Sequence, residues 1–320
     1  MVADSHVDNL NAPSRKMGLR PADPERYANA LRMGRFLRTS GLSYPPAIAY
    51  MDRVTGGWVL GSNDKFGTCG PTSVANLALL LSTWLSDAPV RFTDLEVQDL
   101  YRRSGNPNFD PNTGADDNGV DMTVMLSELV KNGIGAGARN VKALAYAAVP
   151  AQIEVQWTAA SLFGGVLWGA DLQQAQDSQM NSNPPVWDYV KRSRAWGGHA
   201  ILAGASYTDQ PGTVNDITKL ITWAEIVGST DTFINQLVSE RYLVLFPWHL
   251  SNKTFVANTD LATLAADYTA ITGKPFPAVI PPVQPPVDPP VDPPVDPSAG
   301  DAVALLTSLE AQITQFLAGR

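Results

Sequence analysis

The chain has 320 residues, of which 44% are hydrophobic and 17% charged, which suits a globular protein with a buried core. Its formal net charge of −8, without a basic stripe, argues against a nucleic-acid partner. A single cysteine excludes an intramolecular disulfide, and no apolar run approaches the roughly 20 residues of a membrane span. The polar N-terminus lacks the apolar stretch of a signal peptide, so we expect the protein to be cytoplasmic when made.

Residues 1–45 are predicted to form an N-terminal arm and a helix. The first 22 residues or so are polar and unpatterned, as is typical of an extended arm. Asp23 supplies a capping carboxylate and Pro24 a first-turn proline, both of which favour a helix start. Apolar Tyr27, Leu31 and Phe36 extend the predicted helix to about residue 38.

Residues 46–274 are predicted to form one α+β domain. Apolar or amphipathic runs indicate helices over 74–85, 93–103 and 122–132. Short β-branched or aromatic runs indicate strands over 199–207, 220–227 and 241–246. Helices followed by strands favour N-terminal helices packed on an antiparallel sheet.

Residues 275–298 are predicted to be a spacer, and 299–320 a C-terminal amphipathic helix. The repeat PPVQPPVDPPVDPPVDP at 281–297 requires polyproline II, which would hold its ends roughly 50 Å apart. The helix carries one apolar seam and is too short to be stable alone, so we expect it to dock. Its partner would be its own copies, another protein or the preceding domain; the alternative is a frayed tail.

Cys69 lies in a setting that favours a reactive thiol. Pro71 and the apolar run from Val74 predict a helix that begins near the cysteine. Free backbone N–H groups and the positive dipole end would there favour the thiolate. Gly67 and Gly70 would let the backbone approach a substrate closely. The alternative, a buried inert cysteine, needs none of these neighbours.

Two further residues complete a candidate acyl-transfer site. Asn63, six positions before the cysteine, could supply a side-chain amide to an oxyanion; the alternative is a turn residue. The base must be one of three histidines, His6, His199 or His249. His199 follows a Gly-Gly pair and opens an apolar strand, which makes it the best candidate, although a core histidine is the alternative.

These segments resemble papain-like cysteine peptidases, in which a cysteine at a helix start precedes a histidine on a distant strand. CGPTSVAN is similar to the cysteine segment of double-glycine-leader peptidases, and residues 30–250 resemble a papain-like family of bacteria and their phages. The resemblance implies Cys69 as nucleophile, His199 as base and Asn63 in the oxyanion hole. It also implies a substrate cleft, which we assign to Gly70, Gly198, Trp196 and Trp223.

The sequence departs from the pattern of these families at three positions. Thr68 replaces the usual aspartate before the cysteine, and Ala224 replaces the glycine after the strand tryptophan. The segment ending in Thr222 has no asparagine or aspartate to orient the histidine. The hydroxyl of Thr222 or a backbone carbonyl would then accept the imidazole N–H, while Asn215 and Asp216 are predicted to lie in a loop.

No motif indicates a cofactor or a metal. The glycines of 133–137 lack the dinucleotide spacing, and the Asp-rich loop 110–121 fails the EF-hand register. The sequence therefore predicts a cysteine hydrolase that cleaves an amide of a peptide or of a peptidoglycan stem. The alternative is a virion-associated structural or attachment protein, tethered through its C-terminal helix, in which the papain-like domain has degenerated.

Overall fold

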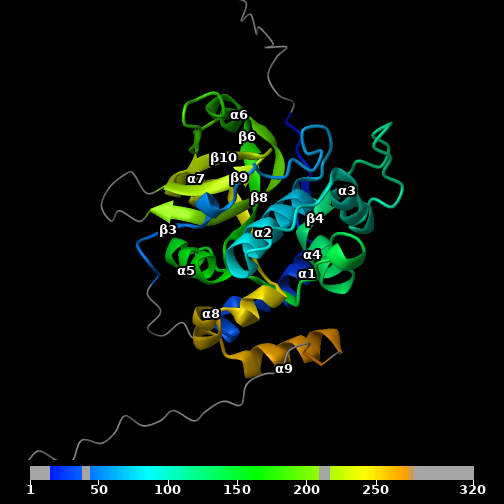
Figure 1. Cartoon of the computed structure of the whole chain (residues 1–320). Helices are drawn as coiled ribbons and strands as arrows, with labels where there is room; N and C mark the ends of the chain where they lie inside the picture. Colours follow the sequence, from blue (N-terminus) through cyan, green and yellow to red (C-terminus); the bar gives the residue numbers. More distant parts are fainter. Residues whose placement is uncertain (1–14, 38–43, 209–216, 274, 277–320) are drawn as a thin grey trace, which may run out of the picture. The chain divides into compact units, whose positions relative to one another are not determined.

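The computed structural model describes residues 15–37, 44–208, 217–273 and 275–276, which belong to one compact unit (Figure 1). His6, Asn215, Asp216, the proline repeat at 281–297 and the predicted helix at 299–320 lie outside the described residues. None of the helices in the described ranges is long and apolar enough to cross a membrane.

The described strands form a large, mostly antiparallel sheet and one short parallel pair. The strands are β1 Leu19–Arg20, β2 Leu31–Arg32, β3 Ala47–Ala49, β4 Val120–Asp121, β5 Ala145–Ala148, β6 Val166–Gln173, β7 Val186–Trp187, β8 Ala195–Thr208, β9 Ile217–Thr222, β10 Glu225–Ser229 and β11 Val238–Leu245. The large sheet has the order β2-β5-β11-β6-β8-β9-β10-β7, and β3 also pairs with β8. β1 pairs in parallel with β4, outside the large sheet. The long strand β8 therefore lies inside the large sheet and pairs with three other strands, β6, β9 and β3.

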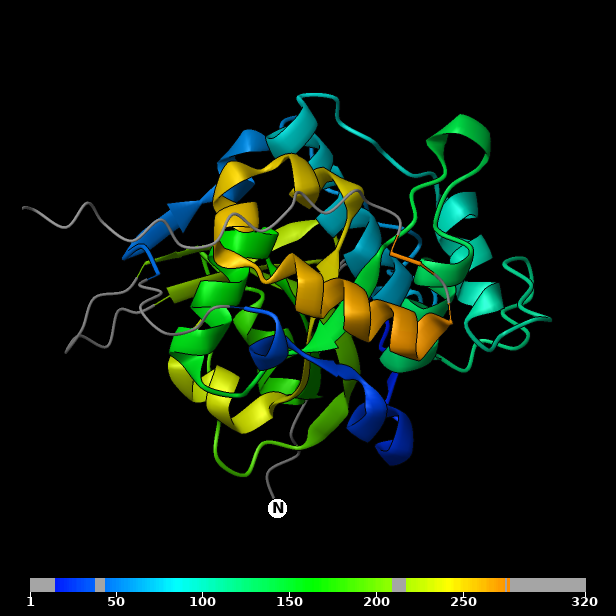
Figure 2. The same cartoon turned by 90° about the horizontal axis from the view of Figure 1, so that it is seen from below.

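Helices cover both faces of this sheet (Figures 1 and 2). They are α1 Pro24–Asn29, α2 Cys69–Ser86, α3 Asp94–Arg103, α4 Met122–Lys131, α5 Ile153–Phe163, α6 Gln174–Gln179, α7 Asp231–Leu237, α8 Lys253–Asn258 and α9 Leu261–Thr272. Side chains of β8 alternate between two cores: Ala200 belongs to the core that contains residues of α2, α3 and α4, and Ile201 to the core that contains residues of α5 and α7. The class predicted from the sequence, α+β with helices on an antiparallel sheet, is confirmed.

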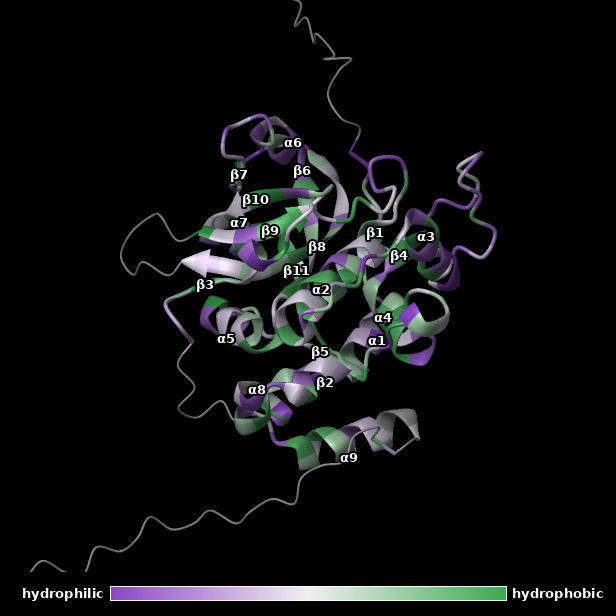
Figure 3. Ribbon diagram, viewed as in Figure 1, coloured by the Kyte–Doolittle hydropathy of each residue, from purple (hydrophilic) through white to green (hydrophobic). Residues whose placement is uncertain are grey.

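Helix α2 is the central element of the first core. Every residue from Cys69 to Ser82 is buried, so the helix has no solvent face over this length. Figure 3 shows the hydropathy of the residues along this helix. Pro71 stands in the first turn, where its missing N–H breaks no intrahelical bond. The predicted helix start at Cys69 is confirmed, and the predicted helices at 93–103 and 122–132 are confirmed as α3 and α4.

The helix predicted over residues 23–38 is much shorter. Asp23 caps α1 as expected, through bonds from the N–H groups of Glu25 and Arg26, but the helix ends at Asn29. The next residues form β2, in which Leu31 pairs with Ala147 of β5. Pairing with the edge of the sheet overrides the helical spacing of the apolar residues, which sequence alone does not reveal.

The single strand predicted over 220–227 is a hairpin of β9 and β10. The turn consists of Trp223 and Ala224, whose φ angles of 46° and 62° lie in the left-handed region. Two-residue hairpin turns of this kind are usually signalled by Asn-Gly or Asp-Gly. A Trp-Ala pair gives no such signal, and the turn places both Thr222 and Trp223 next to β8.

Candidate active site

Cys69 is the first residue of α2, and its side chain is almost fully buried, with 1% exposure. The sulfur accepts a hydrogen bond from the Ala200 backbone N–H at 3.4 Å. Burial raises the pKa of the Cys69 thiol to about 11, although N–H groups of Ala200, Gly70, Cys69 and Gly18 lower it. The thiol is therefore neutral near pH 7. The same backbone N–H groups would stabilise a thiolate if water reached the sulfur and removed the cost of burial.

His199 precedes Ala200 on β8 and is fully buried. Its Nε2 lies 2.6 Å from the Thr222 hydroxyl oxygen, and its Nδ1 has no hydrogen-bond partner. Burial lowers the pKa of His199 to about 3, so the imidazole is neutral near pH 7. Thr222 thus fixes Nε2, and Nδ1 makes no hydrogen bond within the described residues.

The β9–β10 turn orients this imidazole. The Trp223 ring stacks on the His199 ring with 4.3 Å between centroids and an interplanar angle of 17°. Trp196, on β8, lies 5.7 Å from Trp223 between ring centroids. Thr222 and Trp223 therefore restrain the imidazole at one nitrogen and on one face.

Asn63 lies in the loop before α2 and is buried, with 2% exposure. Its side-chain amide donates to the carbonyl oxygens of Phe66 at 3.1 Å and Lys16 at 3.3 Å. Its own backbone carbonyl accepts from the Lys16 N–H at 3.3 Å. The amide therefore already binds a peptide carbonyl, and that carbonyl belongs to a distant segment of the chain.

This segment, residues 15–23, is here called the arm, and it passes directly over the thiol. The Gly18 N–H donates to the Gly198 carbonyl at 3.1 Å, and the Gly18 carbonyl accepts from the Val120 N–H at 2.7 Å. The arm is thus bonded to the sheet on one side and to β4 on the other. The sequence predicted an extended arm and gave no indication that it would cover Cys69.

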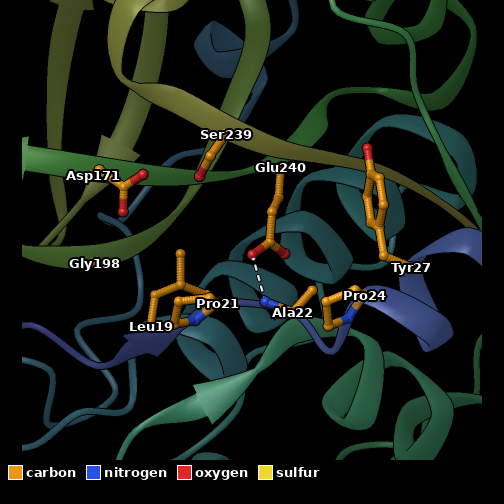
Figure 4. A pocket seen from close by; sticks show the side chains of 9 residues that line it. All are labelled: Leu19, Pro21, Ala22, Pro24, Tyr27, Asp171, Gly198, Ser239 and Glu240. Carbon is orange, nitrogen blue, oxygen red and sulfur yellow. Dashed lines mark hydrogen bonds between the residues drawn. The ribbon is translucent and has the colours of Figure 1, made fainter.

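Further bonds fix the arm beyond the thiol. The Ala22 N–H donates to the Glu240 carboxylate and the Asp23 N–H to the Asp121 carboxylate, each at 2.9 Å. Burial raises the pKa of Glu240. A cavity of about 440 Å³ lies here, lined by Leu19, Pro21, Ala22, Pro24, Tyr27, Asp171, Gly198, Ser239 and Glu240 (Figure 4). The arm itself forms one wall of this cavity.

A buried polar group holds the loop before the cysteine. Asp117 accepts from the Gly67 N–H at 2.9 Å and from the Tyr101 hydroxyl at 2.7 Å, while the Tyr101 oxygen accepts from the Gly119 N–H at 2.8 Å. Burial raises the pKa of Tyr101. Sequence reasoning missed these residues, and the only available signal was the density of Asp, Asn and Gly in 110–121.

Of the two glycines predicted to line the substrate cleft, only Gly198 lies against the arm. Gly198 contacts the arm, since a Cβ there would overlap the Leu19 carbonyl. Gly70 instead packs α2 against Val120 and Met125, because a Cβ there would lie 2.7 and 2.9 Å from their side chains. Within the described ranges, no group of three or more His, Cys, Asp or Glu residues could hold a metal ion.

Comparisons with solved structures return papain-like cysteine proteases. Xylellain, a cysteine protease from Xylella fastidiosa, is similar over 74% of this chain and 98% of its own, with 14% identity and a TM-score of 0.54. Digestive procathepsin L 3 from the larval midgut of Tenebrio molitor is similar over 68% and 77%, with 12% identity and a TM-score of 0.49. No family model and no curated protein sequence matches the chain. The chain has the papain-like fold that its sequence predicted.

The protonation state of Cys69 gives a first prediction. A pKa of about 11 leaves only about 10⁻⁴ of the thiol ionised at pH 7. Because the thiolate is the reactive species, alkylation by iodoacetamide should be slow at pH 7 and rise about tenfold per pH unit towards pH 11. Mass spectrometry of the Cys69 peptide, sampled at fixed times over a pH series, measures this rate. A rate that stops rising near pH 8.5 would contradict the prediction.

Proposed function

We propose that the protein is a cysteine hydrolase of peptide bonds, with Cys69 as nucleophile, His199 as base and the arm covering the thiol. One observation carries the proposal. The Cys69 sulfur, at the start of α2, accepts a hydrogen bond from the Ala200 N–H, and the residue before Ala200 is His199, whose Nε2 is bonded to Thr222. A nucleophile, an adjacent base and an orienting group are the parts that thiol acyl transfer needs.

The reaction follows from the free nitrogen of His199. After the arm has left, Nδ1 takes the proton from Sγ, and the thiolate attacks the carbonyl carbon of the substrate. The Cys69 N–H and the Asn63 amide, released from Lys16, donate to the resulting oxyanion. As the C–N bond breaks, the imidazolium gives its proton to the leaving amine and a thioester remains. Water then attacks the thioester while Nδ1 accepts its proton, the C–S bond breaks to release the acid, and Nδ1 returns the proton to Sγ.

An acyl-enzyme trap tests this assignment. A peptide p-nitrophenyl ester is mixed with the Leu19→Asp variant, in which we expect the arm to be displaced, and the mixture is quenched in acid. We expect the acyl mass on the peptide that contains Cys69, with release of p-nitrophenol. A chain that iodoacetamide alkylates at Cys69 but that carries no acyl group would refute the proposal.

Thr222 is proposed as a positioning residue that acts through His199. The substitution Thr222→Val removes the hydroxyl at 2.6 Å from Nε2 and keeps the side-chain volume. In a chain opened by Leu19→Asp, we expect kcat/KM to fall about tenfold, the value of one hydrogen bond, and Thr222→Ser to restore it. Thr259→Val is the matched control, because that buried hydroxyl bonds only the Phe255 carbonyl. Equal losses of kcat/KM in the two valine variants would contradict a positioning role.

The predictions about substrate, origin and docking partner still rest on the sequence alone. A peptidoglycan substrate, a phage origin and a virion-associated role rest on the resemblance of the cysteine and histidine segments. Docking of residues 299–320 rests on their apolar seam, which lies outside the described residues. The geometry around Cys69 supports the hydrolase, and no contact of the described residues favours the attachment role.

A further inference from the structure

The arm shows how an extended peptide fits against the thiol. Residues 17–19 fill a narrow space, here called the thiol trench, between Gly67 and Gly119 on the helical side and Gly198 on β8. Backbone bonds run from Gly18 to both walls, at 3.1 Å to Gly198 and 2.7 Å to Val120. The trench therefore grips the main chain of its occupant from both sides, as a strand is gripped within a sheet.

The trench leaves no room for a side chain at the residue nearest the sulfur. A Cβ added at Gly18 would overlap the carbonyl oxygen and the Cα of Gly67. The φ of Gly18 is not positive, so space and not backbone conformation requires glycine there. The clash is with main-chain atoms, which cannot move aside as the tip of a flexible side chain would.

The wall that excludes a side chain is itself held rigidly. The Gly67 N–H is bonded to Asp117, which also accepts from the Tyr101 hydroxyl. A Cβ at Gly67 would lie 3.1 Å from the Gly18 Cα, so the two glycines touch. A Cβ at Gly119 would overlap the Gly18 carbonyl oxygen, and one at Gly198 would overlap the Leu19 carbonyl oxygen. Because Gly67, Gly119 and Gly198 line its walls, the trench is only wide enough for the main chain of its occupant.

The neighbours of Gly18 show what the trench accepts on either side. Met17 and Leu19 are partly buried and pack against the two hydrophobic cores. Lys16 pairs with Asp117 at 3.6 Å, and Arg15 pairs with Asp177 at 2.9 Å. The occupant is thus a peptide in which basic residues precede an apolar–glycine–apolar triplet.

We infer that the thiol trench selects peptides with glycine at the residue that faces Cys69, flanked on both sides by apolar side chains. The inference rests on the proposed function, because it names the substrate class of that site. It extends that function from peptides in general to one sequence pattern, of which residues 17–19 of this chain are an example. Any side chain at the central position meets the backbone of Gly67.

The first step of the test uses the chain's own arm. Iodoacetamide labelling of Cys69 at pH 7 is compared between the unchanged chain, Gly18→Ala and Gly34→Ala. Gly34 is the matched control, because a Cβ there meets nothing within 4 Å. We expect Gly18→Ala to expel the arm and raise the labelling rate at least about tenfold, and Gly34→Ala to leave it unchanged. Labelling of Gly18→Ala at the unchanged rate would overturn the inference, since the trench would then accept a Cβ.

The second step offers peptides to the opened trench. The double variant Gly18→Ala, Cys69→Ala is titrated with fluorescein-labelled Arg-Lys-Met-Gly-Leu-Arg-Pro and with the same peptide carrying alanine for glycine. Fluorescence anisotropy should show about 10- to 100-fold weaker binding of the alanine peptide. Equal binding of the two peptides, or binding of neither, would overturn the inference.

The binding readout separates this inference from the proposed function, because the double variant has no thiol. Selective binding of the glycine peptide, without hydrolysis by any variant, would refute the hydrolase and leave the selection standing. Hydrolysis of both peptides at equal rates by Gly18→Ala would refute the selection and leave the hydrolase standing.

Discussion

Replacing Leu19 by aspartate is expected to raise the rate of Cys69 alkylation at pH 7 by about 100-fold. Leu19 is partly buried against the helical core and lines the cavity that contains Asp171 and Glu240 (Figure 4). A carboxylate at this position would lose apolar contact and lie near two acidic residues, which favours release of the arm. Water would then reach the sulfur, and the pKa of the thiol would fall from about 11 towards its ordinary value of about 8.5.

Leu95→Asp provides the matched control for this substitution. Leu95 lies on α3 and is 70% exposed, so the same change of side chain there disturbs no buried contact. Its alkylation rate should equal that of the unchanged chain, and circular dichroism should show that both variants are folded. Slow alkylation of Leu19→Asp, with the midpoint still near pH 11, would show that something other than the arm buries the thiol.

The arm covers the Cys69 thiol with its Gly18 N–H and not with a carbonyl carbon. The Gly18 N–H is directed to the sulfur and to Gly198, and the Gly18 carbonyl is bonded to the Val120 N–H. An attack needs a carbonyl carbon at the sulfur and donors on its oxygen. In the arm, the Gly18 carbonyl therefore lacks the geometry needed for attack by the sulfur, although its main chain fills the thiol trench.

The cysteine and the histidine could be predicted because their signals are local. Pro71 and the apolar run after it place Cys69 at a helix start, and the glycine pair before His199 places it on a strand entering the sheet. Each conclusion needs only a few neighbouring residues and the periodicity of helix or strand. The resemblance to papain-like peptidases joins the two segments, and the fold that it implies is the fold observed.

The rest of the site depends on contacts between residues far apart in sequence. Gly18 binds Gly198 and Val120 through backbone atoms, which leave no trace in side-chain patterns. The left-handed turn at Trp223 and Ala224 has no glycine or asparagine to reveal it, so β9 and β10 looked like one strand. Shortening of the helix predicted over 23–38 likewise follows from pairing of Leu31 with β5. Sequence thus predicts where Cys69 and His199 lie in the fold better than it predicts the segment that covers the thiol.

Replacing His199 by glutamine, in a chain opened by Leu19→Asp, is expected to lower kcat/KM for peptide hydrolysis by about 10³-fold. Glutamine keeps a polar side chain beside Thr222 but cannot accept the thiol proton. In the opened chain, water should also raise the pKa of His199 from about 3 towards its ordinary value of about 6.5. Activity should therefore rise with pH through that region, because the base works only when it is neutral.

His249→Gln is the matched control, because His249 is also fully buried and burial lowers its pKa to about 4. Its ring nitrogens meet only backbone groups of Phe246 and Phe163, away from the thiol. Its replacement should lower the melting temperature, since it breaks buried hydrogen bonds, and leave kcat/KM of the folded fraction unchanged. Initial rates corrected for folded fraction distinguish the two variants. A similar loss of kcat/KM in both would mean that a buried histidine matters here for packing alone, and His199 would not be the base.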